Sequence, residues 1–271
     1  MIRLLNLAAV GALTLSIASA PPVRADSITT DDAFLPAARI TGATGRFRTD
    51  VSIFNPDTNT KARVKIYFTR ADTNGLSVPG IQIDPDLEPR ETVVLKDILG
   101  EYFDVTSDYG VVEVLSSIPV MVTSNTYNID GPNGGTYSQY SPGQPYRNAL
   151  PFDDSIFGDL YVTGIPNDAV HRTNAAIINP TEVPLEAGVE LVTAGGTKLG
   201  SRTYTIPALS MTQLNDIFGA TFASTRPPAG GGYRLNFFVN LKNGARILCY
   251  ATVTDTRTGA PYLIPGQAVR P

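Results

Sequence analysis

The sequence predicts an all-β protein of two tandem antiparallel β-sandwiches, each with one short helix. Three observations support this. Apolar and polar residues alternate along several short segments, turn-forming residues separate these segments, and a set of landmarks occurs twice in the same order. Alternation with a period of two is typical of strands that have one face on a core and the other in water.

The first 25 residues have the layout of a secretory signal peptide. Arg3 precedes an apolar run over 4–20, and two prolines and small residues follow. We expect cleavage after Ala25, because cleavage after Ala20 would leave a proline at the new N-terminus. The alternative is an uncleaved anchor, but the run is shorter than the roughly 20 apolar residues of a spanning helix. The predicted location is secreted or periplasmic, with no membrane span after cleavage.

Composition excludes several functions. Removing residues 1–25 leaves 19 Lys and Arg against 25 Asp and Glu, a formal charge of −6. This leaves no basic patch for nucleic acid. The single cysteine, Cys249, cannot form an internal disulfide, so packed cores must provide the stability. Its place in the run RILCYATV predicts a buried small apolar residue, and a reactive thiol is the alternative.

An internal repeat organises the rest of the chain. RTDVSIFNP from Arg48 returns as RTNAAIINP 124 residues later, LKDILGEYF from Leu95 returns as LNDIFGATF 119 residues later, and PGQ from Pro142 returns 123 residues later. Loop insertions between duplicated modules produce such small changes in spacing. The structural landmarks of this repeat are Arg48, Asn55 and Asp97 in one half and Arg172, Asn179 and Asp216 in the other.

These patterns predict the segmentation of the chain. We expect a signal peptide at 1–25, an N-terminal extension at 26–34, a first β-sandwich module at 35–147, a linker at 148–157 and a second module at 158–271. Each module has seven or eight short strand candidates separated by turn signals.

The clearest strands are ARVKIYFTR and GYRLNFFVN. The other candidates in the first half are RITG, FRTDVSIF, GIQI, TVVL, GVVEVL, PVMVTSNTY and TYSQY. Those in the second half are LYVTG, RTNAAIIN, GVELVT, RTYTI, MTQL, ARILCYATVT and APYLI. A short helix is predicted at 97–103, and again at 216–222.

The landmarks have structural interpretations. Proline has no N–H to donate to a hydrogen bond between strands, and asparagine closes a turn through its side chain. The two Asn-Pro pairs are therefore expected to end strands. Asp97 and Asp216 stand where a carboxylate could cap the following helix, which we rank first. The alternative is that Asp97 pairs with Arg48, and Asp216 with Arg172.

The segment FNPDTNTKARVKIYF, an Asn-Pro turn followed by an alternating strand, resembles the immunoglobulin-like repeat modules of secreted bacterial proteins. The resemblance implies immunoglobulin-like sandwiches that serve as spacers, adhesion units or binding modules. The paired cysteines and the tryptophan that pin antibody domains are absent from this sequence.

Catalytic signatures are missing from the sequence. The one histidine, His171, falls in the slot that Phe47 occupies in the first half, which favours a packing or edge position over a general base. No nucleophile elbow, zinc motif or phosphate-binding loop occurs. We therefore predict no enzyme activity, no cofactor and no metal site. A carboxylate hydrolase using Asp153-Asp154, or Asp84 with Asp86, is the remaining enzymatic alternative.

Two kinds of segment have residues that could bind a ligand. The turns at Asp57, Asp72 and Asn128 offer oxygen ligands for calcium, but none has the spacing of a calcium loop. The segment SNTYNIDGPNGGTYSQYSPGQPY carries four tyrosines among Asn, Ser and Gly, a mixture typical of recognition loops. The candidate ligand-binding residues are Tyr127, Tyr137, Tyr140 and Tyr146, and the alternative is that they are ordinary strand residues.

The expected function is non-enzymatic binding, adhesion or structural support at the bacterial exterior. The partners would be a surface polysaccharide or another exported protein, recognised by loops or by an exposed edge strand. The second hypothesis is a carbohydrate-binding module that uses the tyrosine-rich hairpin of the first half.

Overall fold

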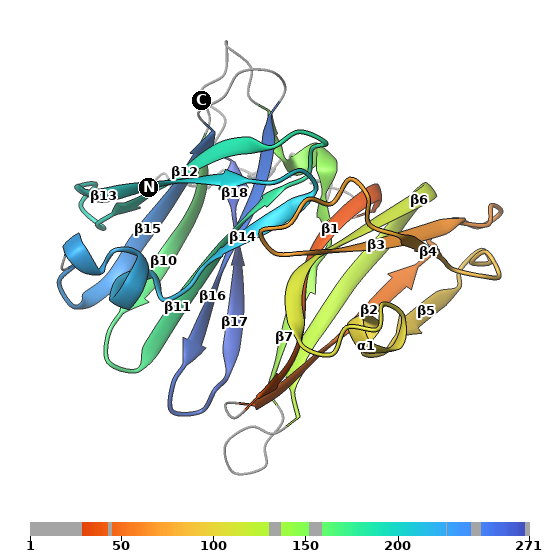
Figure 1. Cartoon of the computed structure of the whole chain (residues 1–271), viewed down its shortest axis with the longest axis horizontal. Coiled ribbons are helices and arrows are strands. Elements are labelled where there is room, and N and C mark those ends of the chain that lie inside the picture. The colour runs from red at the N-terminus through yellow and green to blue at the C-terminus, as the bar shows by residue number, and fades with distance from the viewer. Residues whose placement is uncertain are drawn as a thin grey trace, which may run out of the picture.

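The computed structural model describes residues 29–42, 45–129, 137–151, 159–225, 227–239 and 245–268. Antiparallel strands make up most of this part of the chain, which confirms the predicted all-β class (Figure 1). No helix in the described ranges is long and apolar enough to cross a membrane. The predicted signal peptide lies outside the described residues.

The first half contains one eight-stranded sheet that folds into two layers. Its order is β4-β3-β6-β1-β2-β5, with β7 on β6 and β8 on β1. The strands are β1 (Thr30–Gly42), β2 (Gly45–Phe54), β3 (Val64–Arg70), β4 (Gly80–Gln82), β5 (Thr92–Leu95), β6 (Asp108–Asn128), β7 (Tyr137–Pro142) and β8 (Gln144–Pro145). Helix α1 (Ile98–Glu101) and the 3-10 turn η2 (Tyr146–Asn148) complete this half, and β9 (Leu150–Pro151) follows.

The second half contains two five-stranded sheets. One has the order β13-β12-β15-β10-β18, and the other has the order β14-β11-β16-β17 with β9 added to β16. The strands are β10 (Leu160–Asn167), β11 (His171–Asn179), β12 (Leu185–Val192), β13 (Lys198–Ile206), β14 (Ser210–Leu214), β15 (Gly230–Val239), β16 (Arg246–Asp255), β17 (Pro261–Pro265) and β18 (Gln267–Ala268). The π-helical turn η3 (Ile217–Thr221) and the 3-10 turn η4 (Ala223–Thr225) follow β14.

The two halves have matching strand orders. The layer β4-β3-β6-β1-β8 of the first half corresponds to β13-β12-β15-β10-β18, and the layer β5-β2-β6-β7 corresponds to β14-β11-β16-β17. The order departs from the predicted immunoglobulin-like one. There the first strand pairs with the second and the seventh with the sixth, whereas here β10 pairs with β15 and β16 pairs with β11.

Strand β6 belongs to both layers of the first half. GVVEVL and PVMVTSNTY, predicted as two strands, form one strand that pairs with β3 and β1 near its start and with β2 and β7 near its end. It passes from one layer to the other between Ser116 and Met121, where the pairing with β3 ends and that with β2 begins. Pro119 is tolerated because its missing N–H falls at this transition.

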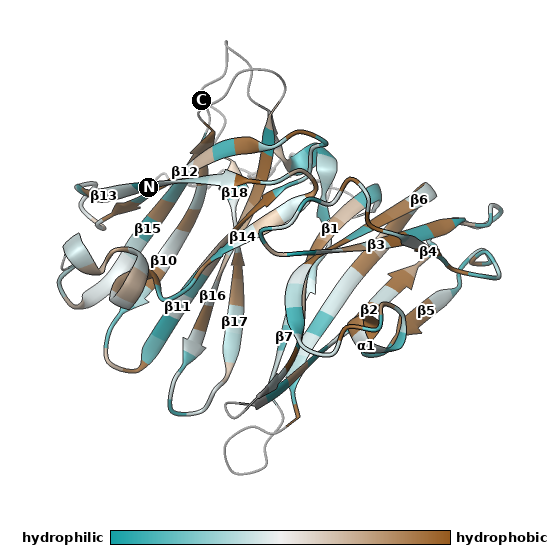
Figure 2. Ribbon diagram, in the orientation of Figure 1, coloured by the Kyte–Doolittle hydropathy of each residue, from teal (hydrophilic) through white to brown (hydrophobic). Residues whose placement is uncertain are grey.

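Alternating strands place one apolar core between the layers of each half, as the banding in Figure 2 illustrates. The predicted inward rows are buried: Val64, Ile66 and Phe68 on β3 and Tyr233, Leu235, Phe237 and Val239 on β15. Cys249 lies fully buried in the second core, as expected, and burial raises the pKa of its thiol.

Two predicted boundaries differ from the structure. Strand β1 begins at Thr30 and pairs with β6 from there, so the end of the predicted extension at 26–34 is part of the sheet. In the predicted linker, Leu150 and Pro151 pair with β16 of the second half. The remaining linker residues, 152–157, lie outside the described ranges.

The Asn-Pro landmark is a buried hydrogen-bonding centre in both halves. The amide of Asn55 donates to the carbonyl oxygens of Thr60 at 2.9 Å, Leu87 at 3.2 Å and Glu88 at 3.0 Å. Asn179 donates in the same way to Val183 at 2.8 Å, Ile206 at 3.3 Å and Pro207 at 2.9 Å. Each asparagine therefore ends its strand, as predicted, and also fixes the connection to the next two.

An apolar interface joins the halves. Phe34 and Val111 of the first half pack with Ile178, Met211 and Leu248 on the outer face of the sheet β14-β11-β16-β17. The loop after β3 reinforces this contact: the N–H of Asp72 donates to the carbonyl of Met211 at 2.9 Å, and the hydroxyl of Thr212 donates to the Asp72 carboxylate at 2.6 Å. The two halves therefore meet face to face.

Candidate binding cleft between the two halves

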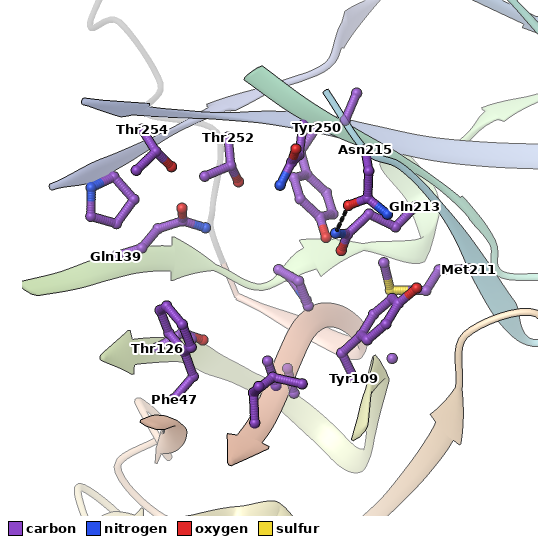
Figure 3. A pocket seen from close by; sticks show the side chains of 18 of the residues that line it. Phe47, Tyr109, Thr126, Gln139, Met211, Gln213, Asn215, Tyr250, Thr252 and Thr254 are labelled. Carbon is purple, nitrogen blue, oxygen red and sulfur yellow. Dashed lines mark hydrogen bonds between the residues drawn. The ribbon is translucent and has the colours of Figure 1, made fainter. Parts of the chain in front are cut away.

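A cleft of about 390 Å³ opens beside this interface. Strands β1, β2, β6 and β7 provide one wall, and β11, β14, β16 and β17 provide the other. Its volume lies within the usual range of small-molecule sites. Figure 3 shows side chains from both halves pointing into the space.

Strand periodicity positions the wall of the second half. On β11, Ala175 and Ile177 face the core, which turns Arg172 and Asn174 to the outer face of the sheet. Cross-strand pairing places Thr254 opposite Arg172 and Thr252 opposite Asn174. The outer face is therefore apolar where it meets the first half and polar where it lines the cleft.

Neutral hydrogen-bonding groups line the polar part of the cleft. Gln213 and Asn215 lie side by side, and the side-chain amide of Gln213 donates to the side-chain oxygen of Asn215 at 2.7 Å (Figure 3). Gln139 on β7 and Thr126 on β6 come from the opposite wall. Amides and hydroxyls of this kind both donate and accept, so they match a ligand that carries several hydroxyl groups.

Three aromatic side chains add apolar surface: Phe47, Tyr109 and Tyr250. Burial raises the pKa of the Tyr250 hydroxyl, with a smaller effect from Tyr109. The pKa of Tyr109 is raised by burial and by the nearby Asp72 and Asp108 carboxylates. Both hydroxyls therefore stay protonated at neutral pH and can donate hydrogen bonds.

Among the described residues that line the cleft, Arg172 is the one charged side chain. It is exposed, and it has no hydrogen-bond or ion-pair partner in the described part of the chain. The acids nearest to it in sequence and register are both engaged: Asp168 contacts His171, and Asp255 binds Arg257.

The two aspartate landmarks have different partners, so each of the two interpretations holds in one half. In the first half the helix-cap prediction is wrong: the Asp97 carboxylate makes no cap and binds Arg39 and Arg48, each at 3.1 Å. In the second half Asp216 caps its helix by accepting from the Gly219 N–H at 2.9 Å. One difference lies on the first strand of each half, because Arg39 of β1 binds Asp97 whereas β10 carries no arginine.

The four predicted tyrosines do not form one surface. Tyr137 and Tyr140 lie on opposite faces of β7, and Tyr140 is 60% exposed. The Tyr127 hydroxyl donates to Asp50 at 3.2 Å, and the ring of Tyr146 lies under the guanidinium of Arg246 near the interface between the halves. The hairpin tip at 130–136 lies outside the described residues.

The other candidate residues have local structural roles. Asp57 accepts from the N–H groups of Asn59 and Thr60, so its oxygens close a turn. Asp84 is exposed and Asp86 lies 3.8 Å from Arg63. His171 is the first residue of β11, and its Nδ1 lies 2.9 Å from the Asp168 carboxylate. Asp153 and Asp154 fall outside the described residues, and the described residues contain no cluster of three or more His, Cys, Asp or Glu that could hold a metal ion.

The sequence interpretation missed the cleft because its residues occupy outward positions of ordinary strands. One signal could have found it. The runs AAII in β11 and LCYA in β16 do not alternate, and all their residues are buried. An unbroken apolar run is typical of a strand covered on both faces. It therefore indicates that a second structure packs on the outside of this sheet.

Comparisons with known proteins give little. No protein-family model matches the chain, and no curated protein matches it. The apo lectin of Pleurotus ostreatus is similar over 90% of this chain and 78% of its own, with 8% identity and a TM-score of 0.23. The lectin from Pleurotus ostreatus in complex with GalNAc is similar over 90% of this chain and 79% of its own, with 9% identity and a TM-score of 0.22.

A serine-rich repeat protein, Srr2, from Streptococcus agalactiae is similar over 86% of this chain and 84% of its own, with 9% identity and a TM-score of 0.18. TM-scores this low carry no argument about fold or ligand.

Proposed function

We propose that this chain is a non-enzymatic binding protein of the cell exterior, made of two duplicated β-sandwich modules, and that the cleft between them binds a carbohydrate. The observation that carries the proposal is the lining of the cleft. It combines aromatic rings with neutral amides and hydroxyls from both halves. Sugars present the matching surface, with apolar ring faces and a rim of hydroxyls.

The absence of carboxylates from the described lining of the cleft supports a binding role over hydrolysis. Glycosidases use two facing acids, one of them with a raised pKa. Among the described carboxyls, the pKa values of Asp32, at about 6, of Glu113, at about 7, and of Asp159 are raised, and burial is the main cause for all three. None of them lines the cleft.

Duplication is supported by details below the level of strand order. Arg90 and Asp97 adopt positive φ angles of 66° and 40°, and Leu209 and Asp216, each 119 residues later, have angles of 49° and 45°. Non-glycine residues seldom adopt this conformation. A recurrence at the same two places therefore favours a common ancestor for the halves.

Binding can be tested on a panel of immobilised glycans. The wild-type chain should bind a subset of the panel, and Thr252→Trp should abolish that binding by filling the cleft. Thr205→Trp, on the exposed side of β13, is the matched control and should bind as the wild type does. A folded wild-type chain that binds no glycan, or an unaffected Thr252→Trp variant, would refute the proposal.

Export is the second part of the proposal and is supported by the pattern of residues 1–25. Mass spectrometry of the protein from the culture medium and the periplasm should find a chain that begins at Asp26. A product that retains Met1 in the cytoplasm would contradict it.

A further inference from the structure

Arg172 has no hydrogen-bond or ion-pair partner among the described residues. It points to the outer face of β11, opposite Thr254 of β16, and lines the cleft without a described partner. The side chain is exposed, and no described hydrogen bond or ion pair holds its guanidinium in place. The guanidinium can therefore bind an anionic group that enters the cleft.

The corresponding arginine of the first half shows what a structural role requires. Arg48 lies 3.1 Å from the Asp97 carboxylate, and it donates to the carbonyls of Phe47 at 2.7 Å and Ile40 at 3.3 Å. In the second half, Asp216 accepts from its own helix and leaves Arg172 free. The same landmark is therefore fixed in one half and available to a ligand in the other.

The surroundings of Arg172 define the group that it can bind. The planar guanidinium matches a carboxylate through two parallel hydrogen bonds. The neighbouring side chains on the same face, Thr252, Thr254 and Asn174, are neutral. A single anionic group at this end of the cleft would therefore be paired, and the rest of the ligand would meet amides, hydroxyls and aromatic rings.

From this arrangement we infer that the ligand is an acidic carbohydrate whose carboxylate binds Arg172. The inference rests on the proposed function, because it specifies the sugar that the same cleft accepts. Long-range attraction contributes little, since the mature chain, with 19 Lys and Arg against 25 Asp and Glu, has a formal net charge of −6 and charges beyond about 10 Å are screened at moderate ionic strength. Selectivity for the acid must therefore come from the direct contact.

The test uses the full mature chain and matched glycans: uronate-bearing oligosaccharides, the same oligosaccharides with their carboxylates methyl-esterified, and neutral oligosaccharides. The wild type should bind the uronates, and esterification should weaken binding about tenfold to a hundredfold, the expected loss of a charge-assisted hydrogen bond. Arg172→Gln should cause a similar loss for the uronates and should make the acid and its ester bind equally.

Two variants serve as controls. Arg172→Lys keeps the charge and should retain part of the preference for the acid. Arg63→Gln removes an arginine that is 72% exposed and does not line the cleft, so it should bind as the wild type does.

The possible failures are distinguishable. Binding of neutral glycans alone, or equal binding of uronates by the wild type and Arg172→Gln, would overturn the acidic ligand while the carbohydrate cleft stands. A folded wild-type chain that binds no glycan of any kind would overturn the proposed function, and this inference with it.

Discussion

Replacing Asn55 tests whether its amide holds the turn between β2 and β3. The side chain is fully buried and makes four hydrogen bonds, three as a donor to carbonyls and one as an acceptor from the Asp57 N–H at 3.0 Å. Asn55→Ala removes all four. Asn55→Asp keeps the shape but places a carboxylate oxygen where the amide donated.

The expected loss follows from what each partner retains. The carbonyls of Leu87 and Glu88 also accept from the backbone N–H groups of Ala62 and Glu91, so each keeps one hydrogen bond. The carbonyl of Thr60 and the N–H of Asp57 lose their hydrogen bond to Asn55 and must bind water instead. Two such groups near the surface correspond to about 2–3 kcal/mol for Asn55→Ala. The Asp variant should lose about 4–5 kcal/mol at neutral pH, because it buries a charge among carbonyl oxygens.

Urea unfolding followed by tyrosine fluorescence suits this chain, which has twelve tyrosines and no tryptophan. A loss of 2–3 kcal/mol lowers the urea midpoint by roughly 1 M. The folded-state pKa of the new carboxyl should lie above its usual value, so the Asp variant should regain stability as the pH falls through that pKa. The exposed Asn59, changed to Ala or Asp, should shift stability by less than about 0.5 kcal/mol. An Asp variant as stable as the Ala variant at pH 7 would refute the role of the amide donors.

Three further predictions concern other parts of the fold. A Cβ at Gly266 would lie 2.2 Å from the sulfur of Cys249, so Gly266→Ala should cost about 1–3 kcal/mol in urea unfolding; Cys249→Ala should recover part of this loss, and no recovery would contradict the clash. The pKa of Glu113 is raised to about 7, mainly by burial and then by Asp32 and Glu182. The stability that depends on the protonated Glu113 is therefore fully present below about pH 4 and is lost as the pH rises through 7. The melting temperature should fall over this range, and Glu113→Gln should flatten the fall. Asp97→Asn should destabilise the chain by about 2–3 kcal/mol because it removes the carboxylate that two half-buried arginines share and leaves them only backbone carbonyl acceptors. Asp216→Asn, which can still cap, should cost less than about 1 kcal/mol. Equal losses would count against the different roles of the two residues.

Local pattern predicted the parts of the fold that depend on local physics. The strand at Val64–Arg70 alternates because one of its faces is buried, and Asn55-Pro56 ends a strand because proline cannot donate to a ladder. The burial of Cys249 followed from its neighbours in the same way. Each of these predictions needed only the residues beside the one in question.

The parts that sequence could not predict depend on contacts across the fold. One partner of Asp97 is Arg39, which is 58 residues away along the chain and is brought next to Asp97 by the position of β1. The start of β1 was hidden because Asp31, Asp32 and Pro36 interrupt its apolar pattern. The cleft required knowledge of how the two halves pack, which only the unbroken apolar runs of β11 and β16 indicated.

One pair of equivalent residues connects the fold with the proposed function. In a duplicated structure, a residue that stabilises one module is free to change its role in the other once a substitute supports the same local structure. The cap that Asp216 places on Gly219 is such a substitute, because it holds the helix without an arginine. Arg172 is therefore not needed to hold this helix, and the face of the sheet that carries it forms a wall of the cleft. If the cleft binds the acidic carbohydrate proposed above, the asymmetry between the modules, more than their shared architecture, determines which end of the cleft receives the charge of the ligand.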